Sequence, residues 1–195
     1  MAVLKIVACC IAGIASVAMS ACAQTIPQVN ISARMADCEF VHNCKPVVTD
    51  SESKFTIVGD TGEGRLVTRT FPGAGSAPGR NLTAYEYRVD LSSISLGGNC
   101  VNQLQITFGD PAVLPLLGNG VKLFVVTSVG PGSIGVRQVQ TNGPNIYIGF
   151  DQPICRGQSS YFVGLGSLSR TPHERKVGAV YLTAGSGAVM KARVP

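Results

Sequence analysis

The chain has 195 residues, a formal net charge of +5, 45% hydrophobic residues and 14% charged residues, which fits one domain with a tail. Charged residues make up about a quarter of an ordinary soluble domain, so this composition excludes a coiled coil and a charge-rich disordered chain. Glycine (23) and proline (11) are abundant, which argues against a mostly helical bundle. His42 and His173 are the only histidines. A histidine-based catalytic centre therefore has few candidates, and the composition leans away from an enzyme.

Residues 1–23 have the pattern of an export signal. Lys5 gives the short first region a positive charge, residues 6–15 are apolar, and small residues end the segment. The apolar stretch is long enough to suggest a membrane span, but Gly13, two serines and the lack of a positive charge directly after it favour a cleaved signal. We therefore expect no transmembrane span after cleavage.

Two cleavage chemistries fit the end of this segment. Ala21-Cys22-Ala23 satisfies the small-x-small rule and would leave Gln24 as the first mature residue. The preceding Met19 begins a bacterial lipobox-like string in which Cys22 would be lipidated, although methionine matches the favoured aliphatic residue poorly. The sequence thus predicts a secreted or periplasmic protein, with lipid anchoring to the outer membrane through Cys22 as the alternative.

The cysteines indicate an oxidising compartment. Three of the seven lie in the signal, and the other four are Cys38, Cys44, Cys100 and Cys155. An even number of cysteines in an exported chain predicts two disulfides, for which three pairings exist. The most economical pairing joins Cys38 to Cys44 and Cys100 to Cys155. In the loop-entropy model the long bridge contributes about 4 kcal/mol and the short one about 2.

The first cysteine pair has a metal-binding alternative. Cys38, His42 and Cys44 place three soft ligands within seven residues. Structural zinc needs a fourth ligand, and the sequence contains no second cluster. The sequence therefore favours a disulfide and predicts no metal or cofactor.

Period-two patterning dominates the chain after the signal. Tyr85, Tyr87 and Val89 alternate with polar Glu86 and Arg88, which predicts a strand with one wet face. Residues 121–129 are largely apolar at both odd and even positions, so both faces of the strand would be apolar, which predicts a strand covered on both sides. The expected strands are 55–58, 66–70, 85–91, 104–108, 121–129, 136–140, 146–150, 161–165, 177–183 and 189–194.

Glycine, proline and asparagine clusters separate these strands at short intervals. Residues 136–150 read as a hairpin closed by 141–144, and no segment after the signal has a helical apolar stripe. About ten short strands predict an all-β, antiparallel β-sandwich of jelly-roll or Ig-like type, with a β-barrel as the alternative. We expect residues 24–53 to be an N-terminal extension that holds the Cys38/Cys44 loop, and residues 54–195 to be one sandwich domain.

A search for chemistry assigns no catalytic residue. The G-x-S-x-G motif is absent, and His173 lies in a polar stretch that reads as a surface loop. Asp60 and Glu63 loosely match the spacing of a calcium loop but lack the full pattern, so they are weak metal candidates beside a plain glycine turn. Glu86 and Asp90 share a strand face with Arg88 and read as a solvated charge ladder.

The tyrosines offer a surface for carbohydrate or peptide. Tyr85, Tyr87, Tyr147 and Tyr161 are the aromatic residues considered for it. Alternating tyrosines on an inward strand face are more often core, and no aromatic platform is evident in the sequence.

Several segments together resemble a known group of proteins. They are 82–91 (LTAYEYRVDL), 99–101, 104–109, 125–133, 153–155 and 160–165. These segments are similar to uncharacterised exported bacterial β-proteins, some of which carry C-terminal sorting tails of the PEP-CTERM kind. The resemblance covers residues 82–183, and this chain ends at Pro195 without such a tail. It implies an extracytoplasmic β-sandwich and no particular activity.

The sequence predicts an exported, non-enzymatic protein of the bacterial envelope or exterior with a structural, adhesive or binding role. Its partner would be an envelope protein, a surface protein or a glycan. Basic residues are scattered, which excludes the basic stripe of a nucleic-acid binder. One alternative is a secreted glycan-active hydrolase with carboxylates that sequence cannot pair. The other is a pilus-type subunit, for which residues 24–33 are the candidate donor strand.

Overall fold

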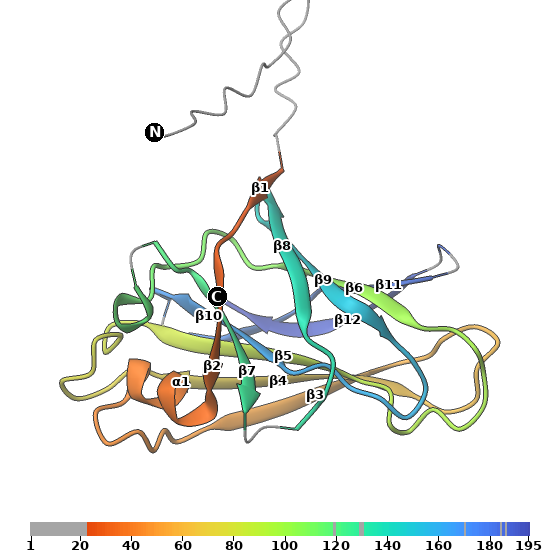
Figure 1. The fold of residues 1–195 in the computed structure, drawn as a ribbon, viewed down its shortest axis with the longest axis horizontal. Coiled ribbons are helices and arrows are strands. Elements are labelled where there is room, and N and C mark those ends of the chain that lie inside the picture. The colour runs from red at the N-terminus through yellow and green to blue at the C-terminus, as the bar shows by residue number, and fades with distance from the viewer. Residues whose placement is uncertain (1–22, 119, 129–130, 170, 184, 186) are drawn as a thin grey trace, which may run out of the picture.

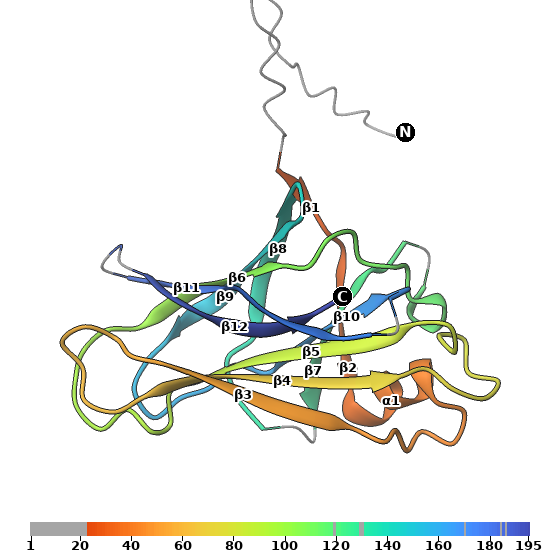
Figure 2. The same ribbon diagram turned by 180° about the vertical axis from the view of Figure 1, so that it is seen from behind.

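Two six-stranded sheets pack face to face in the computed structural model, which describes residues 23–118, 120–128, 131–169, 171–183, 185 and 187–195 (Figures 1 and 2). Sheet A contains, in order, β1 (Gln24–Thr25), β8 (Val136–Asn142), β9 (Asn145–Ile154), β6 (Val101–Thr107), β11 (His173–Leu182) and β12 (Gly187–Val194). Sheet B contains β2 (Gln28–Ser32), β7 (Leu123–Ser128), β10 (Phe162–Ser167), β5 (Thr83–Asp90), β4 (Gly64–Pro72) and β3 (Thr49–Phe55). The predicted all-β sandwich is confirmed.

Helices are few in the described chain: α1 (Ala33–Phe40) and the short 3-10 helix η1 (Pro115–Leu117). Neither of them has the length and apolar character needed to cross a membrane. All sheet pairings are antiparallel except that of β2 with β7, which is parallel.

The main core lies between the sheets. Tyr85 and Tyr87 of β5 are fully buried there with Leu104 and Ile106 of β6. The Tyr87 hydroxyl donates a 2.6 Å hydrogen bond to the carbonyl of Arg193, which satisfies a polar group that burial would otherwise leave unpaired. Both tyrosines are therefore core residues, as the inward alternation predicts.

A second apolar cluster covers the outer face of sheet B. Leu123 and Val125 of β7 face the main core, whereas Phe124 and Val126 face this second cluster. Helix α1 contributes Phe40, whose ring packs edge-on against Phe71 with a centroid distance of 5.4 Å. The prediction that this strand is covered on both sides is confirmed.

Helix α1 was not predicted from the sequence. Ser32 caps its N-terminus by accepting a 3.2 Å hydrogen bond from the backbone N–H of Met35. Ala36 and Phe40, one turn apart, are its buried apolar residues. Eight residues with two apolar contacts are too few to produce a recognisable helical stripe, and the neighbouring sheet supplies the missing stabilisation.

The expected N-terminal extension, residues 24–53, is part of the sandwich. It supplies β1 to sheet A, β2 and most of β3 to sheet B, and α1, which packs on sheet B. Ile26 and Ile31 are buried in the two apolar clusters. The domain therefore begins about thirty residues before the expected boundary at residue 54. The sequence does not reveal this, because β1 and β2 are short and pair with strands distant in sequence.

Two strand expectations need correction. The strand expected at 55–58 lies instead at Thr49–Phe55, where polar side chains pair with β4 along an edge. The outer face of β5 is covered rather than wet, since Glu86 and Asp90 are only 4% and 8% exposed. Strand β5 is central in its sheet, and neighbouring side chains cover its polar residues.

The two sheets approach each other at both lateral edges. At one, β12 and β3 lie side by side, and the backbone N–H of Lys191 donates a 3.0 Å hydrogen bond to the Ser53 hydroxyl. At the other, the chain passes from β1 on sheet A through Pro27 to β2 on sheet B (Figure 1). This arrangement leaves the outer face of sheet A as a broad surface in contact with solvent.

Candidate functional site

The outer face of sheet A carries a continuous set of uncharged polar side chains, here called the amide face. Its members are Gln103, Gln105 and Thr107 of β6, Gln138 and Gln140 of β8, Asn145 and Tyr147 of β9, and Tyr181 of β11. Partners in the strand register line these side chains up across the sheet. None of the eight residues is buried.

Alternation in each strand creates this face. In β6, Val101, Leu104 and Ile106 face the core while Gln103 and Gln105 face outward. Irregularities in pairing between Val101 and Gln103 adjust the register at the start of the strand. The alternation leaves amides outside and aliphatic side chains inside.

Strand register sets the rows of the amide face. The longest row runs Thr25, Gln140, Tyr147, Gln105, Ala179 and Val189, one residue from each of the six strands. A second row runs Gln138, Gly149, Gln103, Tyr181 and Gly187. Neighbouring strands lie about 4.8 Å apart, so the first row extends for about 24 Å.

Hydrogen bonds within the amide face leave several groups available. The Tyr181 hydroxyl donates to the Gln105 side-chain oxygen, and the Thr107 hydroxyl donates to the Asn145 side-chain oxygen over 2.7 Å. Within the part of the chain that the structure describes, the side chains of Gln103, Gln140 and Tyr147 make no hydrogen bond to protein. Their donors and acceptors face solvent and can bind a ligand.

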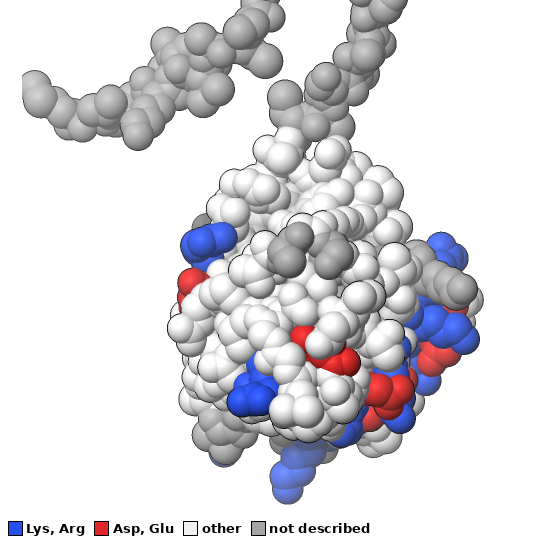
Figure 3. Space-filling model, turned by 90° about the vertical axis from the view of Figure 1, so that its right-hand side faces the viewer, with Lys and Arg blue, Asp and Glu red and all other residues white. Residues whose placement is uncertain are grey.

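Charge is nearly absent from the four strands that carry most of the amide face, whereas β11 and β12 contain charged residues, among them Glu174, Lys191 and Arg193. Strands β1, β6, β8 and β9 contain two charged residues, Arg137 and Asp151. Figure 3 shows a mostly uncharged surface around the β1 end of the molecule, with Lys, Arg, Asp and Glu gathered mainly lower down and to one side. By contrast, strand β3 alone carries Asp50, Glu52 and Lys54. The amide face is therefore chemically distinct from the charged edge strand β3 of sheet B.

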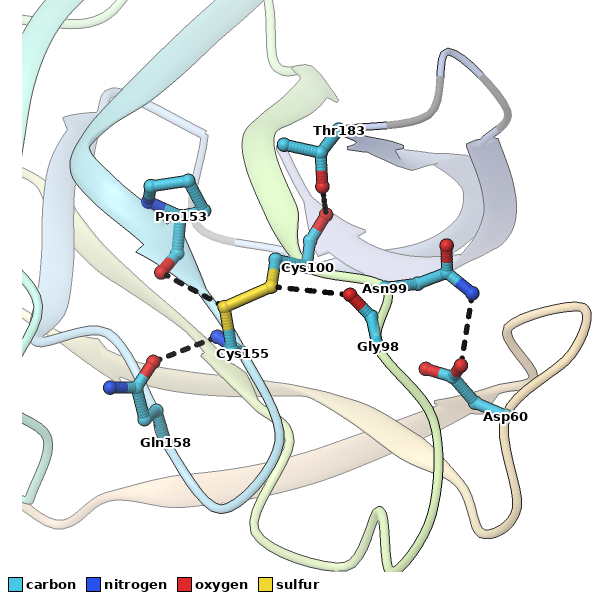
Figure 4. The surroundings of a disulfide bond; sticks show 8 residues. All are labelled: Asp60, Gly98, Asn99, Cys100, Pro153, Cys155, Gln158 and Thr183. Carbon is cyan, nitrogen blue, oxygen red and sulfur yellow. Dashed lines mark hydrogen bonds between the residues drawn. A yellow bond between two sulfur atoms is a disulfide. The ribbon is translucent and has the colours of Figure 1, made fainter.

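The long disulfide fixes the strands at the centre of this face. Cys100 precedes β6 and Cys155 follows β9, and the bridge between them spans a Cα–Cα distance of 4.3 Å (Figure 4). The carbonyl of Cys100 accepts hydrogen bonds from the backbone N–H and hydroxyl of Thr183. The bridge thus links the adjacent ends of β6 and β9 to the chain just beyond β11.

The short disulfide joins Cys38 of α1 to Cys44 beyond it, with a Cα–Cα distance of 4.2 Å. Both predicted pairings are therefore present. The Nδ1 atom of His42 lies 3.0 Å from the Ser76 hydroxyl. With both sulfurs in a disulfide, the metal alternative for Cys38, His42 and Cys44 is wrong.

The weak metal candidates have separate partners. The carboxylate of Asp60 accepts a 2.9 Å hydrogen bond from the Asn99 amide (Figure 4), whereas Glu63 forms a 2.7 Å ion pair with Lys54. Among the described residues, no group of three or more histidine, cysteine, aspartate or glutamate side chains is placed to hold a metal ion. The structure does not join Asp60 and Glu63 in one site.

Glu86 is the buried end of a charge ladder on the outer face of sheet B. The ladder crosses three strands in register, from Asp50 through Arg69 to Glu86. Arg69 bonds Asp50 at 3.1 Å and lies 4.0 Å from Glu86, and its guanidinium stacks 4.8 Å from the Phe162 ring centre. Burial raises the pKa of Glu86 from 4.5 to about 7, although Arg69 opposes the shift.

Glu39 connects α1 to the loop that contains η1. Its side chain is fully buried and accepts a 2.9 Å hydrogen bond from the backbone N–H of Leu116. Burial raises the pKa of Glu39, while this hydrogen bond opposes the shift. This carboxylate therefore anchors a loop to the helix.

Two carboxylates line a small cavity between strand β3 and the edge of sheet A. Glu52 and Glu174 line it together with Lys191 and Arg193, and its volume is about 40 Å³. Ligand pockets usually have a volume of 300 Å³ or more, in round figures. This cavity is too small to hold a sugar between the two acids, so it gives the hydrolase alternative no support.

The remaining sequence candidates are dispersed. His173 is exposed and begins strand β11 opposite Val194, rather than lying in a loop. Tyr161 packs against the main core. Residues 24–33, the candidate donor strand, pair largely within their own sandwich as β1 and β2. Cys22 and the other residues of the expected signal up to residue 22 lie outside the described residues.

Comparison with known proteins gives no relative: no family model, no curated protein and no solved structure matches the chain.

The amide face is the feature that the sequence did not predict. Glutamine alternation in residues 103–107 and 138–140 was the available signal, but it does not reveal which strands become neighbours. Tyr147 is among the surface aromatic residues that the sequence suggests, whereas Tyr181 is not.

Proposed function

We propose that the protein is an exported, non-enzymatic binding protein of the bacterial envelope or exterior, and that the amide face is its binding surface. The carrying observation is a row of exposed, uncharged amide and tyrosine side chains on strands held together by a disulfide. Rigid strands hold binding groups more exactly than loops do. A preformed surface also avoids much of the ordering cost of binding.

Two disulfides support the proposed location, because they persist in oxidising compartments and are rare in the cytosol. The signal pattern of residues 1–23 supports the same location. We propose a secreted or periplasmic protein that begins at Gln24, with lipid anchoring through Cys22 as the alternative. The role in adhesion or surface structure would follow from what the amide face binds.

Fractionation and mass spectrometry test the location. The full chain is expressed in a bacterium with two membranes, and its intact mass is measured before and after reduction. We expect it outside the cytoplasm, beginning at Gln24 or at lipidated Cys22, with a gain of about 4 Da on reduction because each opened bridge takes up two hydrogens. A full-length, reduced, cytoplasmic protein would contradict the proposal.

Adsorption to washed bacterial envelopes tests the binding role. We expect the purified protein to sediment with envelopes and the Tyr147→Ala variant to sediment less, because the variant removes an aromatic side chain from the centre of the amide face. The matched control is Gln152→Ala, an exposed residue near the far end of the same strand. Equal sedimentation of all three proteins would rule out the amide face as the surface used.

A further inference from the structure

We infer that the amide face is a binding site for an uncharged polysaccharide, which lies along the row Gln140, Tyr147 and Gln105 with Tyr181 beside it. This inference rests on the proposed function and specifies its ligand. The row crosses adjacent strands in register, and with its flanking residues it is longer than a single sugar ring. A chain of sugars is therefore the expected form of the ligand.

The polar groups of the row match sugar hydroxyls. A side-chain amide offers two donors and one acceptor oxygen, whereas a sugar hydroxyl both donates and accepts. The oxygen of Gln105 already accepts from the Tyr181 hydroxyl, so its NH₂ group is oriented and free to donate. Gln140 and Gln103 lack protein partners in the described chain and offer both functions. Neutral hydroxyl groups can use every one of these positions.

The tyrosines supply the apolar part of the contact. Tyr147 is partly exposed at the centre of the row, and Tyr181 is 38% exposed in the neighbouring row. An aromatic side chain presents an apolar face and a polar tip, which matches a sugar ring with C–H groups on its faces and hydroxyls at its edge. Gly149 follows Tyr147 on the same face and carries no side chain, and the Gln138 side chain lies over it, with its Cγ atom 3.4 Å from where a Cβ would be.

The charge distribution selects a neutral ligand. A polyanion would need cationic partners. The basic residues Lys191 and Arg193 of β12 line the cavity next to β3, whereas strands β1, β6, β8 and β9, which carry the row, contain one basic residue, Arg137. A polycation would need acids, of which these strands have one, Asp151. Binding to the amide face should therefore change little with salt.

A second copy of the chain fits this surface less well. The centre of a stable protein interface is apolar and well packed, with charged residues depleted and amides mostly at the rim. Here glutamines flank the central Tyr147 on both sides, and Val189 lies at the end of the row. Burying these amides against an identical amide surface would require each one to find a partner.

Affinity electrophoresis tests the inference with the full chain expressed with its own N-terminal segment. Native gels contain one soluble polysaccharide each, either neutral (a β-glucan, xylan, galactomannan or dextran) or acidic (alginate or polygalacturonate). We expect at least one neutral polysaccharide to retard the protein, with a dissociation constant that changes less than twofold between low and 0.5 M salt. The Tyr147→Ala and Gln105→Ala variants should bind at least fivefold more weakly.

Two controls separate binding from folding. Gln152→Ala should bind like the native protein, and Tyr147→Phe, which keeps the ring, should lose less affinity than Tyr147→Ala. Melting temperatures should agree among all variants, since the altered side chains are not buried. Retardation by acidic polymers alone, or retardation that Tyr147→Ala leaves unchanged, would overturn the inference. So would a dimer that Tyr147→Ala dissociates, because the face would then belong to a second copy.

The two proposals can fail separately. If the protein adsorbs to envelopes through Tyr147 but no neutral polysaccharide retards it, the binding role stands and the ligand class is wrong. If the protein is cytoplasmic and reduced, the proposed location fails whatever the gels show.

Discussion

Glu86 is a carboxyl group whose protonation is coupled to folding. It is buried between strands, and Arg69, its ion-pair partner, also pairs with Asp50. Asp37 on α1 and Asp50 on β3 further raise the pKa of Glu86 by charge repulsion. Folding therefore favours the protonated form of Glu86 over a pH range in which an exposed glutamate is ionised.

The Glu86→Gln variant should remove part of the pH dependence of stability. The folded pKa of Glu86 is about 7 and its usual value is 4.5, so between these values the folded state binds more protons than the unfolded state. Its stabilising contribution is complete below about pH 4.5 and is lost as pH rises through about 7. Between pH 5 and pH 8, the unfolding free energy of the native protein should fall by about 2 to 3 kcal/mol more than that of the variant. Urea denaturation at the two pH values measures this.

Glu52 provides the matched control. It lies on the edge strand β3, is about half exposed and pairs with Arg65 at 3.5 Å. Exposed pairs of this kind contribute about 0 to 1 kcal/mol, so Glu52→Gln should keep the native pH dependence. Asp37 and Glu39 also have raised pKa values, which leaves a smaller slope of the same sign in Glu86→Gln. An unchanged slope in that variant would show that Glu86 is ionised throughout.

At the scale of elements, two loops pack together at the end of the sandwich next to the long disulfide. Thr61 and Leu96 form an isolated bridge, with a 2.8 Å hydrogen bond from the N–H of Thr61 to the carbonyl of Leu96. Beside it Gly97 has a φ of +128°, and a Cβ there would lie 1.9 Å from the Asp60 side-chain oxygen. Only glycine allows this close approach without displacing Asp60.

Substitution of Gly97 by alanine should destabilise the protein by more than about 2 kcal/mol, because it combines a clash with an unfavourable backbone conformation. The neighbouring Gly98→Ala variant is the control, since a Cβ at Gly98 meets nothing within 4 Å. It should change stability by less than about 0.5 kcal/mol. Unfolding free energies from urea titrations compare the two, and similar values would show that the loops separate readily.

Elements whose periodicity is local were predictable from sequence. The hairpin of β8 and β9 and the doubly covered β7 follow from short stretches of alternating or continuous apolar residues. The outer face of β5 is not wet as the alternation predicts, because Arg69 of β4 pairs with Glu86 and both Arg69 and Arg88 stack on Phe162 of β10, and no local pattern shows these contacts between strands. The amide face has the same origin: its rows depend on the pairing of β6 with β9 and β11, which no local pattern encodes.

For the whole molecule, the two disulfides differ in the length of chain that they close. Cys100 and Cys155 are 55 residues apart, whereas Cys38 and Cys44 are six residues apart. Serine replacement of the long pair should cost about 4 kcal/mol, and that of the short pair about 2, because the longer loop restricts the unfolded chain more. Denaturant titration of both double variants measures the order. A larger loss of stability on replacing the short pair would show that the packing of α1, and not the length of the closed loop, determines the order.

The path of the N-terminal segment has a consequence for the timing of assembly. Strand β1 pairs with β8, where Gln24 lies opposite Thr141, and β2 pairs with β7, where Val29 lies opposite Phe124. Strands β1 and β2 must therefore wait for segments about a hundred residues further along the chain before they can pair. Contacts so distant in sequence form slowly. We expect this edge of the sandwich to be the last part to become protected, well after the local hairpins have formed.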